Sequence, residues 1–140
     1  MSEFDVKPLN WTPDPNIGYT VERRADGGLN VTFSNINHAT IQHWREFALA
    51  HLENSDRLTR NRYDLRAIHN LPHEAIDYAL EVNTDPSVRN IRLAVVVVDA
   101  QVAQSVREIV ALSTGGVELA VFHELEAAEA WLSRPLTLVV

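Results

Sequence analysis

Histidine and carboxylate side chains follow several apolar, strand-like runs of the sequence, at the points where those runs end. His69 and His73 follow the run "YDLRAI", and Asp99 follows "IRLAVVVV". A third run, "VELAVF", is followed by His123 and Glu124. In an open α/β sheet, ligands bind outside the carboxyl ends of the parallel strands. Mixtures of histidine and carboxylate can hold zinc or carry out acid–base catalysis there, which makes these residues the first candidates for a site.

The spacing of these side chains favours a surface over a metal centre. Pro72 stands between His69 and His73, and no H-E-x-x-H pattern places two histidines on one helix face. Asp99 has a second explanation, since aspartate is a common N-cap of a helix. We therefore predict no metal, no cofactor and no catalytic residue, while a small metal-dependent enzyme using the histidines stays an alternative. The predicted ligand or partner surface, at the carboxyl edge of the sheet, comprises His69, His73, Glu74, Asp99 and His123.

Length and composition exclude several classes of protein. The 140 residues suffice for one domain with one core, and the apolar (46%) and charged (22%) fractions are those of a globular protein. No apolar run reaches the roughly 18 residues of a membrane-spanning helix. A net charge of −7 disfavours nucleic acid as a partner, and the absence of cysteine excludes disulfides and thiolate catalysis. The N-terminus lacks the pattern of a secretory signal, so we expect a cytoplasmic protein.

The elements that must position these residues alternate between strands and helices. "ADGG" supplies the turn of a hairpin between two β-rich runs, and "IRLAVVVV" is typical of a central parallel strand covered on both faces. Residues 1–17 contain three prolines and Trp11, which predicts an extended arm before a single domain at 18–140. We predict strands at 19–24, 29–33, 62–68, 91–98 and 117–122, and helices beginning near Asn37, Pro72, Asp99 and Glu124.

Three segments give the sequence a resemblance to the SpoIIAA-like families, the STAS domains and their relatives. They are "YDLRAI", "RLAVVVVDA" and "VELAVFHELEAAEAWL". The resemblance extends from about Tyr19 to Leu132. Together with the order ββαβαβαβα, it implies an α/β fold of the SpoIIAA-like (STAS-like) type, with a mixed, mostly parallel five-stranded sheet and about four helices.

The resemblance also implies a non-enzymatic module that binds a protein partner, as anti-anti-sigma factors do, or one that binds hydrophobic ligands or associates with membranes. Partner-switching relatives carry a phosphorylatable serine just after the third strand. This chain has "LPHEAI" there, and no serine or threonine lies between Leu65 and Val82. Glu74 offers at most a fixed negative charge in the first turn of a helix, which is common in any protein. We therefore predict an interaction or regulatory module without the serine switch.

Large apolar side chains on two predicted helices suggest a hydrophobic pocket. Trp44 and Phe47 belong to the first helix, and Trp131 belongs to the last. Such residues more often form the core, so a carrier of a small hydrophobic molecule is the alternative function. The strand at 91–98 is apolar on both faces, and any part of the sheet that the helices leave open needs a cover. We expect a homodimer that provides this cover with its N-terminal arm or its "LTLVV" tail.

Overall fold

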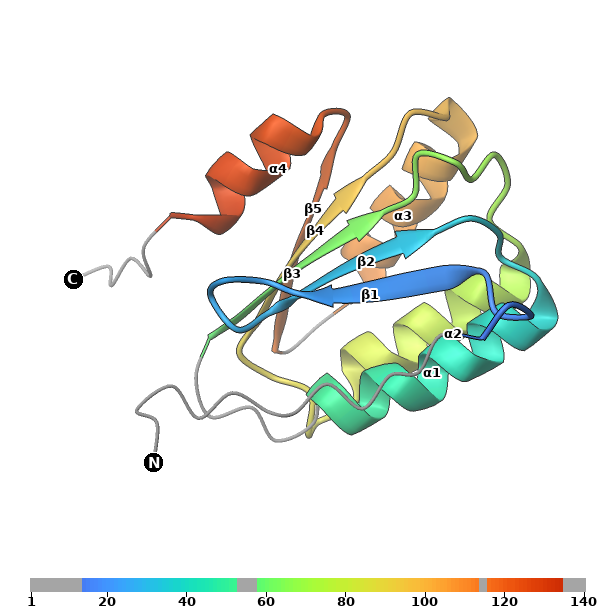
Figure 1. Cartoon of the computed structure of the whole chain (residues 1–140), viewed down its shortest axis with the longest axis horizontal. Helices are drawn as coiled ribbons and strands as arrows, with labels where there is room; N and C mark the ends of the chain where they lie inside the picture. The colour runs from blue at the N-terminus through green and yellow to red at the C-terminus, as the bar shows by residue number, and fades with distance from the viewer. Residues whose placement is uncertain (1–13, 53–57, 114–115, 135–140) are drawn as a thin grey trace.

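Five strands form one sheet in the order in which they occur along the chain (Figure 1). The computed structural model describes residues 14–52, 58–113 and 116–134. The first two strands are antiparallel and are joined by the predicted hairpin turn, in which Gly27 has a φ of 93° that suits glycine. Every later pair is parallel. The strands are β1 (Tyr19–Arg23), β2 (Leu29–Phe33), β3 (Thr59–Asp64), β4 (Ile91–Val96) and β5 (Val117–Phe122).

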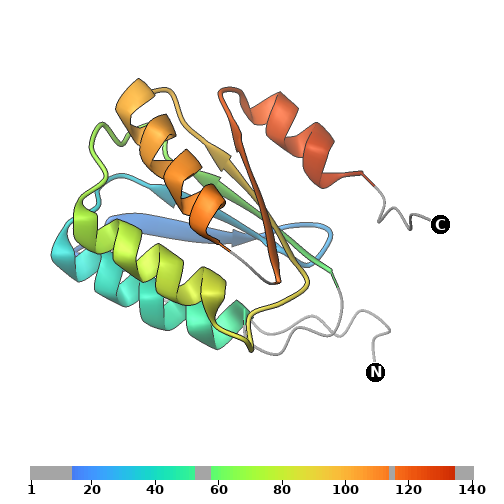
Figure 2. The same ribbon diagram turned by 180° about the vertical axis from the view of Figure 1, so that it is seen from behind.

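Three helices cover one face of the sheet and the fourth covers the other, as Figures 1 and 2 show. Right-handed crossovers between successive neighbouring strands place their helices on the same face. The last helix follows the last strand, and it folds back over the opposite face. None of the helices in the described part of the chain is long and apolar enough to cross a membrane. The helices are α1 (His38–Leu52), α2 (His73–Thr84), α3 (Ala100–Leu112) and α4 (Leu125–Leu132).

The predicted α/β fold and the predicted order of its elements are confirmed, whereas two strand boundaries were wrong. The strand predicted at 62–68 lies at Thr59–Asp64. It ends early because the Asp64 carboxylate accepts a hydrogen bond from the Arg66 N–H (3.0 Å), and the Ile68 N–H donates to the Leu65 carbonyl (3.0 Å). These contacts turn the chain away from the sheet. The central strand likewise ends at Val96 instead of residue 98.

Strand β4 is buried at all six positions because helices cover both of its faces. Ile91, Leu93 and Val95 belong to the large core beneath α1, α2 and α3. On the opposite face, Ala94 and Val96 pack against α4. The outer face of β1 and β2 carries exposed polar residues, so the described part of this face is not an apolar surface in need of a cover. Trp11 and the "LTLVV" tail, together with most of the predicted arm, lie outside the described residues.

A cluster of charges fastens α4 to the sheet. Glu129 of α4 accepts hydrogen bonds from Arg24 (2.7 Å) and Arg62 (2.6 Å), which come from the hairpin and from β3. Arg24 also binds Asp26 (3.1 Å). The hydrogen bond from Arg24, followed by the charges of both arginines, lowers the pKa of Glu129 below its ordinary value. The carboxylate therefore stabilises the folded state only while it is ionised.

Replacing Glu129 with glutamine is expected to lower the free energy of unfolding by about 1 kcal/mol at pH 7, because the arginines lose a charged acceptor that is partly exposed to water. The pKa of Glu129 is lowered in the folded state, so this contribution is complete above the ordinary glutamate pKa. It should disappear as the pH falls through the lowered pKa. Urea denaturation between pH 7 and pH 3 measures this dependence.

Glu108→Gln is the control, since Glu108 is an exposed carboxylate away from the first turn of its helix, α3. Equal stability of the two variants at pH 7 would show that the cluster does not fasten α4. A difference between the variants that stays constant down to pH 3 would also contradict the proposed role of the Glu129 charge.

Candidate functional site

An apolar cavity of about 80 Å³ lies between the sheet and helices α1, α2 and α3. None of the residues that line it carries a charge. Four of the strands supply its floor, and the three helices and two of the connecting loops supply its walls. The lining residues are Phe33, Ile36, Ile41, Trp44, Tyr63, Leu65, Leu71, Ala75, Ala79, Asn83, Leu93, Val95, Val106, Ile109 and Leu119.

The cavity exists because the inner stripe of α2 is made of short side chains. Ala75, Ala79 and Asn83 follow one another at intervals of four residues, so they lie on the same side of the helix, and all three line the cavity. Helix α2 packs mainly against its neighbours α1 and α3. A methyl group extends only a short distance from the helix, and the space between α2 and β4 is therefore left unfilled.

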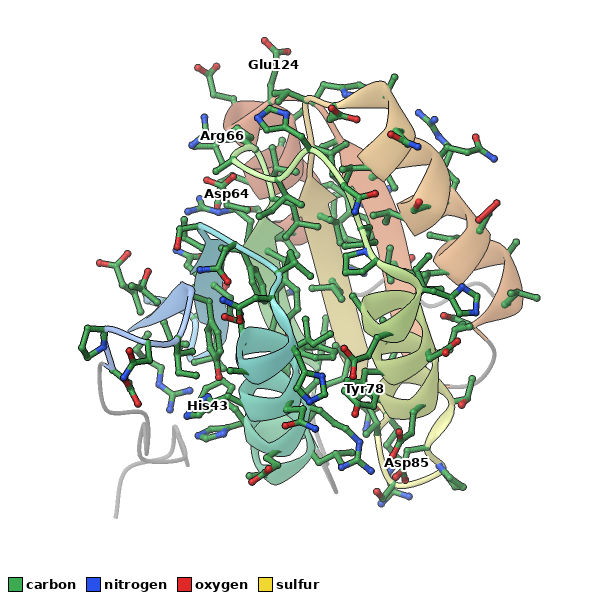
Figure 3. The ribbon with its side chains drawn as sticks, turned by 90° about the vertical axis from the view of Figure 1, so that its right-hand side faces the viewer. His43, Asp64, Arg66, Tyr78, Asp85 and Glu124 are labelled. Carbon is green, nitrogen blue, oxygen red and sulfur yellow. The ribbon has the colours of Figure 1, made fainter. Side chains whose placement is uncertain are left out.

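Contacts on the outer side attach α2 to α1. His38 Nδ1 lies 2.6 Å from Glu74 Oε2, and two turns further along both helices Arg45 pairs with Glu81. The Arg45 guanidinium also lies over the Tyr78 ring, 5.7 Å from its centroid, and Figure 3 shows Tyr78 on α2. The hydrogen bond from Arg45 lowers the pKa of Glu81. These surface contacts add modestly to the packing of α2, whose Val82 is fully buried in the core.

A hydrogen-bonded aromatic pair forms part of the cavity wall. The indole N–H of Trp44 donates to the Tyr63 hydroxyl oxygen (3.0 Å), and the two rings meet edge to face at a centroid distance of 6.1 Å. Both side chains are buried. Burial raises the pKa of Tyr63 to about 12, so its hydroxyl stays protonated at neutral pH. Tyr63 therefore keeps a proton that it can donate.

The three residues predicted for a hydrophobic pocket are not brought together. Trp44 lines the cavity. Phe47 is buried in the same core, with its ring stacked on His51 at 4.1 Å, but it is not among the lining residues. Trp131 lies on the opposite face of the sheet, where its ring meets Phe122 at 5.5 Å. The sequence placed Trp131 correctly on the last helix, but it did not indicate that α4 covers the face of the sheet opposite α1, α2 and α3.

The predicted surface at the carboxyl edge of the sheet divides into separate pairs. His69 Nδ1 lies 3.4 Å from Asp99 Oδ2, so the structure brings these two together. His73 instead lies 3.7 Å from Asp77, on its own helix. His123 Nδ1 donates to the carbonyl oxygen of Val97 (3.1 Å). Glu74 faces His38, as described above.

Asp99 at this edge also has a structural role. Its Oδ1 accepts hydrogen bonds from the backbone N–H groups of Val102 (3.2 Å) and Gln101 (2.8 Å), as predicted for the N-cap of α3. These bonds, first among them that from Val102, lower its pKa. Figure 3 shows Asp64, Arg66 and Glu124 at the same end of the molecule. Across the described ranges, no three histidine or carboxylate side chains gather closely enough to hold a metal ion.

Sequence reasoning did not find the residues that create the cavity. Ala75 and Ala79 are ordinary helix-forming residues in a sequence, and Tyr63 is an ordinary strand residue. The only sequence feature that could have indicated the cavity is the lack of a large side chain at Ala75, Ala79 and Asn83, the side of α2 that lines it. These small side chains indicate a cavity only once it is known which strands this side of α2 faces.

Tyr63→Phe is expected to lower the free energy of unfolding by about 1–3 kcal/mol, because the buried Trp44 N–H loses its acceptor. Trp44→Phe removes the donor, so the double variant should lose less stability than the sum of the single variants, by about 1 kcal/mol. Urea denaturation of all three variants measures this coupling. Tyr78→Phe, on the surface of α2, is the control and should change stability little. Additive losses would contradict an energetic role of the Trp44–Tyr63 hydrogen bond.

Comparison with known proteins supports the fold. No protein-family model matches the sequence, and no curated protein matches it. The chain is similar to the crystal structure of an uncharacterised protein of the DUF3478 family, which has a SpoIIAA-like fold and comes from Shewanella loihica PV-4. The two are 18% identical, the TM-score is 0.58, and the match covers 87% of this chain and 99% of that chain. The chain therefore has the SpoIIAA-like fold that its three sequence segments predicted.

Proposed function

We propose that the chain is a non-enzymatic protein that binds a small apolar molecule in the cavity between α2 and the sheet. The observation that carries this proposal is the cavity itself, with a volume of about 80 Å³ and no charged residue in its lining. Protein cores are normally packed with few voids larger than a water molecule. An apolar space of this size is costly to leave empty and offers no group that would hold water firmly.

The expected affinity for a small ligand follows from the size of the cavity. Moving a hydrocarbon of five or six carbons out of water contributes about 0.8 kcal/mol per carbon, or about 4–5 kcal/mol in total. Because association also costs translational and rotational freedom, this gain sets the tightest dissociation constant that could result at about 0.2–1 mM. Small hydrocarbons are therefore suitable probes, and a larger natural ligand would need α2 to move outward from the sheet.

The chemistry of the lining supports binding without catalysis. Tyr63 is the only residue in the lining that can titrate, and its pKa of about 12 keeps its hydroxyl protonated. A general base or an activated nucleophile needs a pKa much closer to the working pH. The cavity walls therefore offer a place for a ligand and no group to transform it.

Benzene is expected to bind wild-type protein and to shift the NMR signals of the lining methyl groups of Leu93, Val95 and Val106. Ala79→Leu should weaken this binding by at least about tenfold, because the larger side chain occupies the cavity. Titrations followed by methyl NMR measure both dissociation constants. The thermal stabilisation by benzene should fall in parallel.

Ala127→Leu is the matched control, because Ala127 is exposed on α4, on the opposite face of the sheet. It should bind benzene as the wild type does. Native mass spectrometry of protein purified from its own cells should detect a small adduct that Ala79→Leu lacks. Equal benzene binding by Ala79→Leu and wild type, with the fold intact, would refute the proposed site.

A protein-interaction role is the second candidate, and the edge of β5, which pairs with no second strand among the described residues, favours it. Strand β5 has one neighbour in the described sheet, and Glu118 is its only charged residue. Leu119 and Val121 are only half-buried. An apolar edge strand with unpaired backbone groups is a template for another strand. Under this second proposal, β5 pairs with β5 of a second copy of the chain and forms a homodimer.

Val121→Pro tests this pairing. The Phe122 carbonyl accepts from the Val97 N–H, so Phe122 directs its backbone toward β4 and Val121 directs its N–H toward the open edge. Proline at such an edge position should preserve the fold and abolish the dimer. Sedimentation velocity at several concentrations measures the association. The proposed pairing of β5 with β5 would be contradicted by a wild-type chain that stays monomeric at all concentrations, or by a Val121→Pro variant that still dimerises.

A further inference from the structure

We infer that a ligand enters and leaves the cavity between the starts of helices α1 and α2, when the first turns of α2 move away from the sheet. The inference rests on the proposed binding function and specifies the access route to that site. A cavity enclosed by strands and helices exchanges its contents only when part of its wall opens. The part that opens most readily is the part with the fewest buried contacts.

Two partly buried lining residues mark this end of the cavity. Ile36 and Leu71 both line it, and solvent reaches part of each side chain. Ile36 stands two residues before α1, and Leu71 stands two residues before α2. Figures 1 and 2 show these helices side by side and running in the same direction. Their starts are adjacent, because His38 Nδ1 lies 2.6 Å from Glu74 Oε2. Ile36 and Leu71 therefore stand between the cavity and solvent at this end.

The first turn of α2 is weakly held. Its N-cap residue is Pro72, which makes no side-chain hydrogen bond to the turn, whereas Asp99 accepts two such bonds at the start of α3. A helix start without a capping side chain is less stable. Ala75 is the only buried residue in the first half of α2, and its methyl group contributes little apolar burial. The partly exposed pair of His38 and Glu74 adds only modestly.

The other end of α2 is held by buried side chains. Val82 is fully buried, Asn83 is buried beside it, and Val88 is buried just beyond the helix. Moving this end outward would expose all three residues to water, which costs more free energy than exposing Ala75 alone. The last turn of α2 therefore stays in place and serves as the hinge about which the first turns move.

The two neighbouring helices offer no easier opening. Leu119 of β5 also lines the cavity and is partly buried, so a route past α3 is the alternative. However, α3 has four buried residues and a capped first turn, and α1 has six buried residues. Displacing either helix would expose more apolar surface than displacing the first half of α2. The start of α2 is therefore the weakest part of the wall.

Cross-linking the starts of α1 and α2 tests this route. The chain contains no cysteine, so His38→Cys with Glu74→Cys provides a unique pair for a short bis-maleimide cross-linker. Relative to the same variant without cross-linker, benzene should exchange at least about tenfold more slowly, with an unchanged dissociation constant. Relaxation dispersion of the lining methyl groups measures the exchange rate. Arg45→Cys with Glu81→Cys, cross-linked two turns further along, is the control and should slow exchange much less.

A capping substitution tests the same route without a cross-linker. Pro72 has the extended backbone of an N-cap residue (φ −66°, ψ 155°), which aspartate also adopts at position 99. Pro72→Asp should supply the missing cap and slow benzene exchange by about threefold to tenfold. Pro72→Ala is the matched control, because it removes the ring without supplying a cap, and it should not slow exchange.

These measurements separate the access route from the binding function. Equal exchange rates in Pro72→Asp and Pro72→Ala, or equal slowing by the two cross-links, would overturn the inferred route and leave the proposed hydrophobic site intact. Failure of benzene to bind the wild-type protein at all would refute the proposed function itself.

Discussion

The burial of β4 on both faces is the constraint on which the rest of the structure depends. All six of its residues are buried and five of them are apolar, so the chain must supply an apolar layer on each face of one strand. The crossovers provide the first layer, with α1, α2 and α3 on one face, and α4 provides the second. Because α4 is short, charged contacts from Glu129 to Arg24 and Arg62 hold it on the sheet. Strands β1 and β2 lie beyond α4, and their outer face is polar.

The two layers are unequal in how well they fill space. Helix α4 presses Ala128 and Leu132 directly onto Ala94 and Val96 of β4, and all four are fully buried. Helix α2 presents Ala75 and Ala79 to the sheet, and a cavity remains. The fully buried Val82, with a modest addition from surface pairs to α1, holds α2 in this position. Incomplete packing on one face is thus compatible with a stable sheet because the other face of β4 is closely packed.

The sequence contained enough information for the fold and little for the site. The β-branched run of β4, the hairpin turn at "ADGG" and the cap at Asp99 each express a local preference that the structure keeps. The end of β3 was misplaced because a side-chain turn at Asp64 stopped the strand while apolar residues continued. Trp131 was placed near Trp44 because a helix pattern does not state which face of a sheet the helix will cover. The cavity depends on the short side chains of Ala75 and Ala79, and their effect can be recognised only once the part of the sheet that they face is known.

The sequence suggested two sites, the carboxyl edge of the sheet and a hydrophobic pocket, and they differ in whether their residues already serve the fold. At the carboxyl edge, Asp99 caps α3, His123 donates to Val97, and Glu74 faces His38, so these groups already serve the fold. In the cavity beneath α2, the lining residues carry no charge, and an apolar space of about 80 Å³ remains unfilled. A polar group whose hydrogen bonds are already made needs no ligand, whereas an unfilled apolar cavity gains stability from a molecule that fills it. The physical argument for a bound ligand is therefore stronger for the cavity beneath α2 than for the histidines at the carboxyl edge.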